Sequence, residues 1–233
     1  RNIKMTVQPQ VSMVVMDQYT GEVKGLLGGR GEKTANLTLN RATDAVRQPG
    51  STFKVVAAYA PALDAAGMSL ASTQYDGPYI YEDGQDKRLV KNWAGDPYTG
   101  WTSIRYGIQQ SKNIMAVKTY TQNGSAIGLS YLDKFGFSTI QTVTDANGRN
   151  DYGPTVALGG LTVGVTNLEL TGAYATIANA GFYQEPIFYT KIEDQEGNVV
   201  IDKTVDRESH QVISEANAWL LTSAMQDVVT KGT

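Results

Sequence analysis

The most telling segment of this 233-residue chain is Arg47-Gln48-Pro49-Gly50-Ser51-Thr52-Phe53-Lys54. Pro49-Gly50 ends a polar stretch, and residues 51–60 are rich in alanine and apolar side chains without a turn signal. This pattern predicts a buried helix that begins at or near Ser51, with Pro61 as a candidate kink. Ser51 and Lys54 are then one turn apart on the same face, where their side chains can meet.

This pair has the composition of a nucleophile and its base. A serine hydroxyl is a weak nucleophile until another group accepts its proton, and an ordinary lysine ammonium cannot do so. Burial in an apolar wall disfavours the charged form of lysine and lowers its pKa, so that Lys54 can act as the base. Free backbone N–H groups in the first helical turn, where Ser51 lies, favour a developing oxyanion.

A second motif, Ser111-Lys112-Asn113, occurs once in the chain. We expect it at the junction of two helices, one capped by Thr102 and running to residue 110, the other covering 113–121. The hydroxyl of Ser111 is suited to relay a proton to a leaving amine, and the amide of Asn113 to hold a peptide-like substrate. Each motif taken alone also fits an ordinary helix start or interhelix turn.

Composition excludes several other classes of protein. A hydrophobic content of 41% is enough for a sizeable core, and a net charge of −3 with both signs interspersed indicates no nucleic-acid partner. No apolar run approaches the roughly 20 residues that span a bilayer. The chain has no cysteine and one histidine, His210, in a polar stretch where we expect a solvated loop. Thiol catalysis and a multi-histidine metal site are excluded, and we expect neither metal nor cofactor.

The remaining pattern indicates an α+β fold: an antiparallel sheet flanked by helices, with a helical subregion. A hairpin is expected over residues 11–29, and the stretch 76–100, dense in glycine, aspartate, tyrosine and proline, is expected to be a long surface excursion. Further helices are expected at 125–135, 167–179 and from the cap Ser214 to about 231, and strands at 187–193 and 199–201.

The two motifs with their flanks, Arg47 to Tyr59 and Gly100 to Asn113, resemble the transpeptidase domain of class A penicillin-binding proteins. The resemblance spans nearly the whole chain, and its most distinctive block runs from Ala157 to Gly181. It implies the fold of penicillin-binding proteins and serine β-lactamases. In the family that block is structural, so it receives no catalytic role.

The resemblance implies a peptidoglycan D,D-transpeptidase that cross-links stem peptides through a serine acyl-enzyme, and that β-lactam antibiotics acylate the same serine. Ser51 would be the nucleophile, Lys54 the base, Ser111 the proton relay, and Asn113 a substrate-binding residue. Trp101 is a further candidate for substrate binding near the cleft, although an aromatic in such a loop also fits packing.

One family feature is missing from the chain. Neither Lys-Thr-Gly nor Lys-Ser-Gly occurs, and the terminal Lys231-Gly232-Thr233 has the wrong order. We therefore expect the transpeptidase domain, residues 11–233, to be cut off before that third motif. The missing part would supply a cation for the substrate carboxylate and a strand to pair with the peptide, either as a separate fragment or not at all.

Residues 1–10 resemble the end of an interdomain linker. The resemblance then implies an upstream glycosyltransferase domain and a membrane anchor, which would place this domain at the extracytoplasmic face of a bacterial membrane.

Two alternatives stay open. The first is a hydrolase of the same superfamily, a D,D-carboxypeptidase or a β-lactamase, although the Glu-x-x-Leu-Asn pattern of class A β-lactamases is absent. The second is an inert module that senses β-lactams or binds the cell wall, against which the presence of both Ser51 and Lys54 argues.

Overall fold

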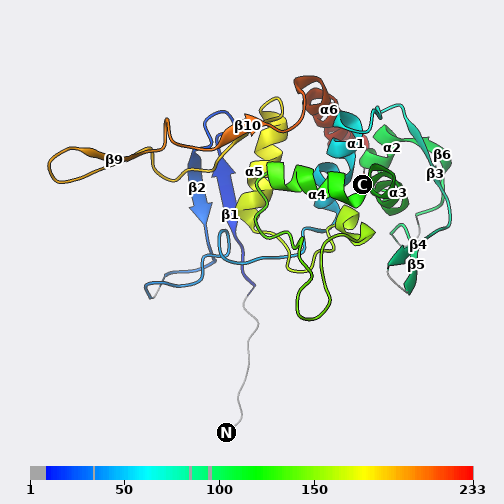
Figure 1. Ribbon diagram of the computed structural model, residues 1–233, viewed down its shortest axis with the longest axis horizontal. Coiled ribbons are helices and arrows are strands. Elements are labelled where there is room, and N and C mark those ends of the chain that lie inside the picture. Colours follow the sequence, from blue (N-terminus) through cyan, green and yellow to red (C-terminus); the bar gives the residue numbers. More distant parts are fainter. Residues whose placement is uncertain (1–8, 34, 84–85, 94–95, 233) are drawn as a thin grey trace, which may run out of the picture.

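The computed structural model describes residues 9–33, 35–83, 86–93 and 96–232. Its centre is a helical segment that runs from Gly50 to Asp64 and is surrounded by α3 (Asn113–Asn123), α4 (Ser125–Lys134) and α6 (Glu215–Lys231), as Figure 1 shows. Phe53, Tyr59, Ile114, Tyr120 and Leu132 are fully buried in this core. The expected buried helix at Ser51 is therefore confirmed, and the most apolar part of the sequence forms the core.

That central helix is not a regular α-helix. It begins as the 3-10 turn η1 (Gly50–Thr52), continues through the π-helical segment η2 (Val55–Tyr59) and ends as α1 (Ala60–Asp64). Pro61 has no N–H to donate to the preceding turn, and a π segment widens the turn where that bond is lost. The expected disturbance at Pro61 is thus a change of helical pitch on its N-terminal side.

The described strands form five separate two-stranded antiparallel sheets. The first hairpin, β1 (Met13–Met16) with β2 (Val23–Leu27), lies beside α5 (Asn167–Ala178). The other pairs are β3 (Thr73–Asp76) with β6 (Gly100–Ser103), β4 (Tyr79–Asp83) with β5 (Asp86–Val90), β7 (Phe182–Gln184) with β10 (Ser209–Gln211), and β8 (Lys191–Glu193) with β9 (Val199–Asp202). The α+β class is confirmed, with the sheet present as separate ladders.

Helix ends follow the local cap signals. Thr166 and Glu169 form a reciprocal capping box at the start of α5, and Ser214 caps α6 by accepting from Asn217 N at 3.4 Å. Gly124 ends α3 with a positive φ. The short helix η3 (Pro154–Leu158) packs against α3.

Four expectations differ from the structure. The cap of α2 (Ile104–Gln109) is Ser103, which accepts from Tyr106 N, while the expected cap Thr102 belongs to β6. The surface excursion 76–100 contains a hairpin, because β4 and β5 pair with apolar Ile80 opposite Leu89 and acidic Glu82 opposite basic Lys87. Residues 187–190 are not a strand, although Ile187 bridges Glu22.

His210 is the fourth difference: it lies in β10 rather than in a solvated loop. Its ring packs on Tyr183 with centroids 5.1 Å apart, and its Nε2 lies 2.8 Å from the carbonyl oxygen of Lys134. The ring therefore has an apolar face that a polar sequence window does not reveal.

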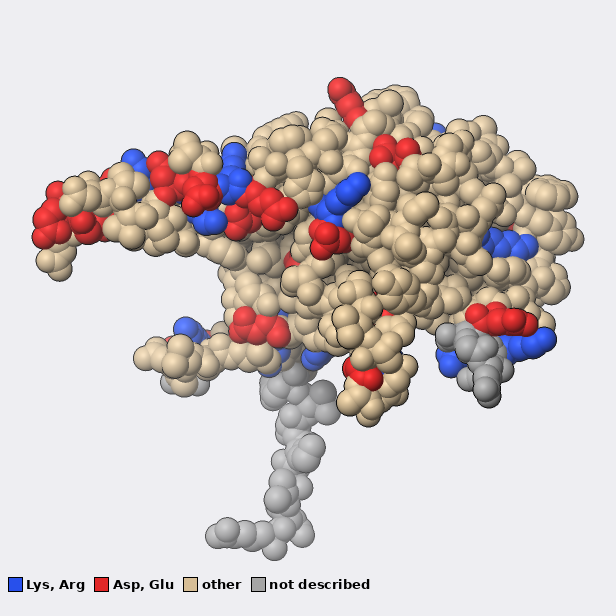
Figure 2. Space-filling view, in the orientation of Figure 1, with Lys and Arg blue, Asp and Glu red and all other residues tan. Residues whose placement is uncertain are grey.

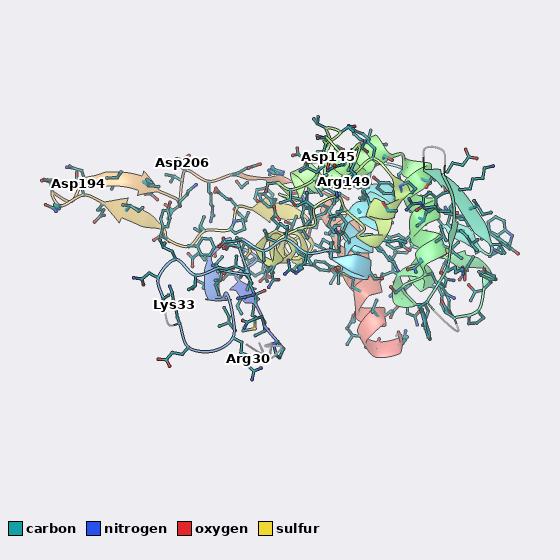
Figure 3. The ribbon with its side chains drawn as sticks, turned by 90° about the horizontal axis from the view of Figure 1, so that it is seen from below. Arg30, Lys33, Asp145, Arg149, Asp194 and Asp206 are labelled. Atoms are coloured by element: carbon teal, nitrogen blue, oxygen red, sulfur yellow. The ribbon has the colours of Figure 1, made fainter. Side chains whose placement is uncertain are left out.

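Positively and negatively charged side chains are interspersed over the face of the molecule that Figure 2 shows. Several acidic side chains gather at the end of the projecting β8–β9 hairpin. Asp194 lies at the tip of that hairpin, far from the helices, and Asp145 and Arg149 form an ion pair of 2.8 Å in another surface turn (Figure 3). Among the described residues, no helix combines the length and apolar character that crossing a bilayer requires.

Candidate active site

Ser51, Lys54 and Ser111 line one pocket of about 320 Å³ between the central helix and α6. Its other walls are mostly apolar. They are formed by Thr52, Val55, Tyr59, Ile108, Tyr174, Met225, Val228 and Val229. Apolar pockets with a few convergent polar groups are typical ligand sites, so the structure brings three of the sequence-predicted residues into one candidate site.

Lys54 lies at the centre of the polar contacts. Only 3% of the residue is exposed, and its Nζ donates to the Ser111 carbonyl at 2.6 Å, to Ser111 Oγ at 2.9 Å and to Asn113 Oδ1 at 2.6 Å. All three partners are neutral oxygens. Lys54 therefore joins the two motifs across 57 and 59 residues of sequence.

Burial lowers the pKa of Lys54 to about 8 from its ordinary value of 10.5. The three neutral acceptors favour the ammonium form and oppose this effect, but no carboxylate is among the hydrogen-bond partners that Lys54 has in the described chain. A substantial fraction of neutral amine is therefore accessible at mildly alkaline pH, as a base requires.

Ser51 lies in the 3-10 turn at the mouth of the pocket and is exposed. No hydrogen bond joins Ser51 Oγ to Lys54 Nζ within the described residues. Catalytic hydrogen bonds are often long in ligand-free enzymes and tighten when substrate binds. The next residue, Thr52, is held from α5, because the Tyr174 hydroxyl donates to its carbonyl oxygen at 2.7 Å.

The turn before Ser51 is fixed by a segment more than a hundred residues away. Gln48 pairs with both backbone groups of Leu161, donating to its carbonyl at 2.7 Å and accepting from its N–H at 2.6 Å. Gly159 has a φ of +70°, and a Cβ there would lie 2.4 Å from the Gly50 carbonyl oxygen. Only glycine allows this approach, so the distinctive block around Gly159 supports the serine turn structurally, as expected.

The Ser111 turn connects α2 and α3, at the expected junction. Ser111 is one of the few residues other than glycine with a positive φ, at +49°. Asn113 begins α3, and its amide is used at both ends: Oδ1 accepts from Lys54, and Nδ2 donates to the Lys91 carbonyl at 2.8 Å. Asn113 is therefore linked to the site through Lys54 and does not line the pocket itself.

Trp101 and His210 lie elsewhere. Trp101 is on β6, is 73% exposed and packs edge-to-face on Tyr75 with centroids 5.7 Å apart. It is not among the residues that line the pocket, so its role in substrate binding stays a prediction. His210 does not line the pocket either, which leaves Lys54 as the basic side chain there.

Sequence reasoning missed the α6 wall and two tyrosines. Met225 and Val228 look like ordinary residues of an amphipathic helix, and no local signal marks them as pocket walls. Tyr59 and Tyr174 stand in largely apolar helices, where a tyrosine is also an ordinary core residue and gives no local signal of a pocket. Burial raises the pKa of Tyr174 to about 12, so it is a hydrogen-bond donor and not an acid at neutral pH.

No group of acidic or histidine side chains able to hold a metal ion occurs in the part of the chain that the structure describes. The pocket presents the hydroxyls of Ser51 and Ser111 and the amine of Lys54, to which the amide of Asn113 is hydrogen-bonded from outside the pocket.

The family model for the penicillin-binding protein transpeptidase domain matches residues 11–233. Penicillin-binding protein 1F of Bacillus subtilis (strain 168) is 36% identical over 222 residues, covering 95% of this chain and 28% of that protein. Penicillin-binding protein 1A of Clostridium tetani is 33% identical over 233 residues, covering 96% of this chain and 28% of that protein. The chain thus spans less than a third of the length of these relatives.

Among solved structures, penicillin-binding protein 1A of Haemophilus influenzae is similar with a TM-score of 0.78 and 26% identity, covering 95% of this chain and 35% of that one. The D,D-transpeptidase domain of a peptidoglycan glycosyltransferase from Eggerthella lenta has a TM-score of 0.70 and 19% identity, covering 95% and 61%, and supports the fold alone. Its fold and its family match agree, and the chain belongs to the transpeptidase domains of class A penicillin-binding proteins.

Proposed function

We propose that this chain carries the acylation machinery of a peptidoglycan D,D-transpeptidase. The observation that carries the proposal is the setting of Lys54, a lysine without a carboxylate partner in the described chain, in the apolar pocket that also holds Ser51 and Ser111. The family membership supports the substrate class: peptidoglycan stem peptides and, as mimics, β-lactam antibiotics.

In the proposed reaction, neutral Lys54 accepts the proton of Ser51 Oγ while this oxygen attacks the carbonyl carbon of the penultimate D-Ala. The peptide bond to the terminal D-Ala then breaks, and the proton passes from Lys54 through Ser111 Oγ to the leaving amine. The 2.9 Å contact between Lys54 Nζ and Ser111 Oγ supports this path. An amine of a second stem peptide then attacks the acyl-enzyme and gives its proton to Lys54. Lys54 passes this proton to Ser51 Oγ as the bond to the acyl group breaks, which restores the serine hydroxyl and the neutral lysine.

The domain is proposed to continue beyond residue 233 with a strand that carries the Lys-Thr-Gly motif. Gln109 and Gln110 both donate to the Lys231 carbonyl, at 3.1 and 3.3 Å, so α6 ends beside the Ser111 turn. A following segment would therefore start close to the pocket. Upstream, we propose that residues 1–10 end a linker from a glycosyltransferase domain and a membrane anchor, with this domain outside the cytoplasm. Residues 1–8 of that linker lie outside the described residues.

The test is intact mass under denaturing conditions, before and after incubation with a penicillin, followed by peptide mapping. The full-length protein that contains this chain is expected to gain one penicillin mass on Ser51, and the Ser51→Ala variant none. Residues 1–233 alone are expected to gain none, because the cationic and strand elements are missing. A full-length protein that stays unmodified would refute the proposal, and an adduct that hydrolyses within minutes would favour a β-lactamase.

A further inference from the structure

Lys112, the middle residue of the second motif, is buried in a polar cluster of its own. Only 1% of its side chain is exposed. Its Nζ lies 2.8 Å from Asp96 Oδ1, 2.9 Å from the Pro97 carbonyl oxygen and 3.2 Å from Asp76 Oδ2. An ammonium group has three donors, so these three acceptors match its capacity.

Asp76 is as deeply buried as Lys112, and its carboxylate has further donors. Asn92 Nδ2 donates to Oδ1 at 2.9 Å, and the N–H and hydroxyl of Thr99 both donate to Oδ2 at 3.0 Å. Asp76 stands at the end of β3, and Thr99 directly precedes β6. The two ends of the excursion 76–100 are therefore joined at the Lys112 cluster.

The same excursion contacts the two residues that follow Lys112. Asn92 Oδ1 accepts from Ile114 N at 3.3 Å, and the Lys91 carbonyl accepts from Asn113 Nδ2 at 2.8 Å. Ser111 itself is in the left-handed region, which a residue with a Cβ adopts only when its surroundings impose it. The cluster at Lys112 is the adjacent fixed point that can impose it.

From these contacts we infer that Lys112 is a positioning residue: anchored to Asp76 and Asp96, it holds the Ser111 turn so that Ser111 Oγ and the Ser111 carbonyl face Lys54 Nζ. The excursion 76–100 is then part of the acylation machinery, although it does not line the pocket. This inference rests on the proposed function, because the effect is exerted on the base of that reaction.

The chemistry explains why a lysine suits the position. A compact cation on a long stem reaches two carboxylates and a carbonyl from within the turn, whereas a neutral side chain would leave Asp76 buried without a counter-charge. The two ion pairs link Lys112 to Asp96 and Asp76, which lie 16 and 36 positions earlier in the chain. Their geometry therefore fixes the Ser111 turn relative to β3 and β6.

The test measures penicillin acylation of the full-length protein, separated into the constant for reversible binding and the limiting rate constant. For Lys112→Met we expect the limiting rate constant to fall by about 10-fold or more, because displacement of a reacting group by about 1 Å can cost 100-fold. Reversible binding should change much less. A purely structural role would lower the folded fraction without changing the rate constant of the molecules that remain folded.

Two further variants keep the test decisive. Lys112→Met combined with Asp76→Asn and Asp96→Asn removes the ion pairs without leaving a buried charge. We expect this triple variant to be more stable than Lys112→Met and to show the same loss in the limiting rate constant. Asp64→Asn is the matched control, because Asp64 is a carboxylate that accepts from Tyr131, Ser214 and Asn217 away from the pocket. It should lower stability and leave the limiting rate constant unchanged.

The outcomes separate the two claims. If wild type is acylated and both Lys112 variants reach its limiting rate constant within twofold, the positioning role is overturned and the proposed function stands. If wild type takes no acyl group, the proposed function fails, and the inference fails with it.

Discussion

Two buried lysines, Lys54 and Lys112, lie close to the Ser111 turn, and the groups around them differ in charge. Lys54 is 3% exposed and contacts neutral oxygens, whereas Lys112 is 1% exposed and contacts two carboxylates. Burial lowers the pKa of Lys54 to about 8. Burial also lowers that of Lys112, but Asp96 and Asp76 outweigh it and raise the pKa of Lys112 above its ordinary value. The neighbouring charges, rather than the degree of burial, decide which lysine can lose a proton near neutral pH.

Under the proposed function, this difference separates a lysine that is suited to accept a proton from a lysine that is suited to fix a turn. Lys54 is protonated at a cost in stability, because its ammonium is desolvated without a counter-ion. Lys112 has its charge balanced and fixes a turn. Lys54 contacts Ser111 Oγ directly, whereas Lys112 is joined to Ser111 only through the backbone, so substitutions can test the two roles separately.

The largest expected effect is on acylation in Lys54→Met. Removal of a general base is expected to lower the rate of penicillin acylation at Ser51 by about 10²–10⁴-fold. The matched control is Lys118→Met, which removes a half-buried lysine that donates to the Tyr75 carbonyl at 2.6 Å, outside the pocket. Mass spectrometry of time points gives the rates. If Lys54→Met is acylated at the wild-type rate, Lys54 is not the base, and the proposed chemical difference between the two lysines is refuted.

Substitution of the two lysines should also change the free energy of unfolding in opposite directions. At pH 7, Lys112→Met leaves Asp76 buried without its counter-charge and is expected to lower the free energy of unfolding by about 3–5 kcal/mol. Lys54→Met removes an unbalanced buried charge and is expected to raise it. Urea unfolding at pH 7 measures both, and a loss of stability of equal size in both variants would contradict the assignment.

The size of the stability effect of Lys54→Met depends on pH in a defined direction. The pKa of Lys54 is about 8 in the folded chain and about 10.5 in the unfolded chain, so between these values the unfolded chain binds the extra proton. The contribution of Lys54 to the free energy of unfolding of the wild type is therefore expected to become more favourable as the pH rises from 8 to 10.5. The advantage of Lys54→Met should shrink over the same range.

The pH dependence of acylation sharpens the same contrast. Because only neutral Lys54 can accept the Ser51 proton, the limiting rate constant is expected to rise about tenfold per pH unit below a midpoint at or slightly above 8. Stopped-flow or quenched time courses from pH 6 to 10 measure it. A rate that is independent of pH over this range would mean that Lys54 is not the titrating base.

The smallest expected effect comes from a helix cap away from both lysines. Thr166→Ala breaks the capping box with Glu169 and is expected to lower the free energy of unfolding by about 1 kcal/mol. Its limiting acylation rate constant should match wild type, because the hydrogen bond from α5 to the serine turn comes from Tyr174 and not from the capped end of the helix. A clear loss of rate here would show that stability alone governs acylation, and would weaken the Lys112 argument as well.

Local signals predicted most of the helices correctly. The cap Ser214 was expected, and it acts within one helical turn, so a short window contains its information; the same holds for the cap Thr166 and the stop at Gly124 that the structure shows. The predicted cap of α2 was one residue too early. Thr102 is also a capping residue, but β6 continues to Ser103, which pairs with Thr73, and the helix begins only after it. The hairpin within 76–100 was missed because turn residues dominate its flanks.

The sequence by itself determined the nucleophile and base candidates, since Ser51 and Lys54 are one turn apart in any helix. The family motifs also placed Ser111 and Asn113 in the same site. Tertiary structure alone decided that Lys54 contacts both of them, that α6 walls the pocket, and that Lys112 pairs with Asp76 and Asp96. The physical reason is that burial and charge pairing depend on residues far apart in the chain. Two lysines with similar propensities therefore acquire opposite pKa shifts only after the chain has folded.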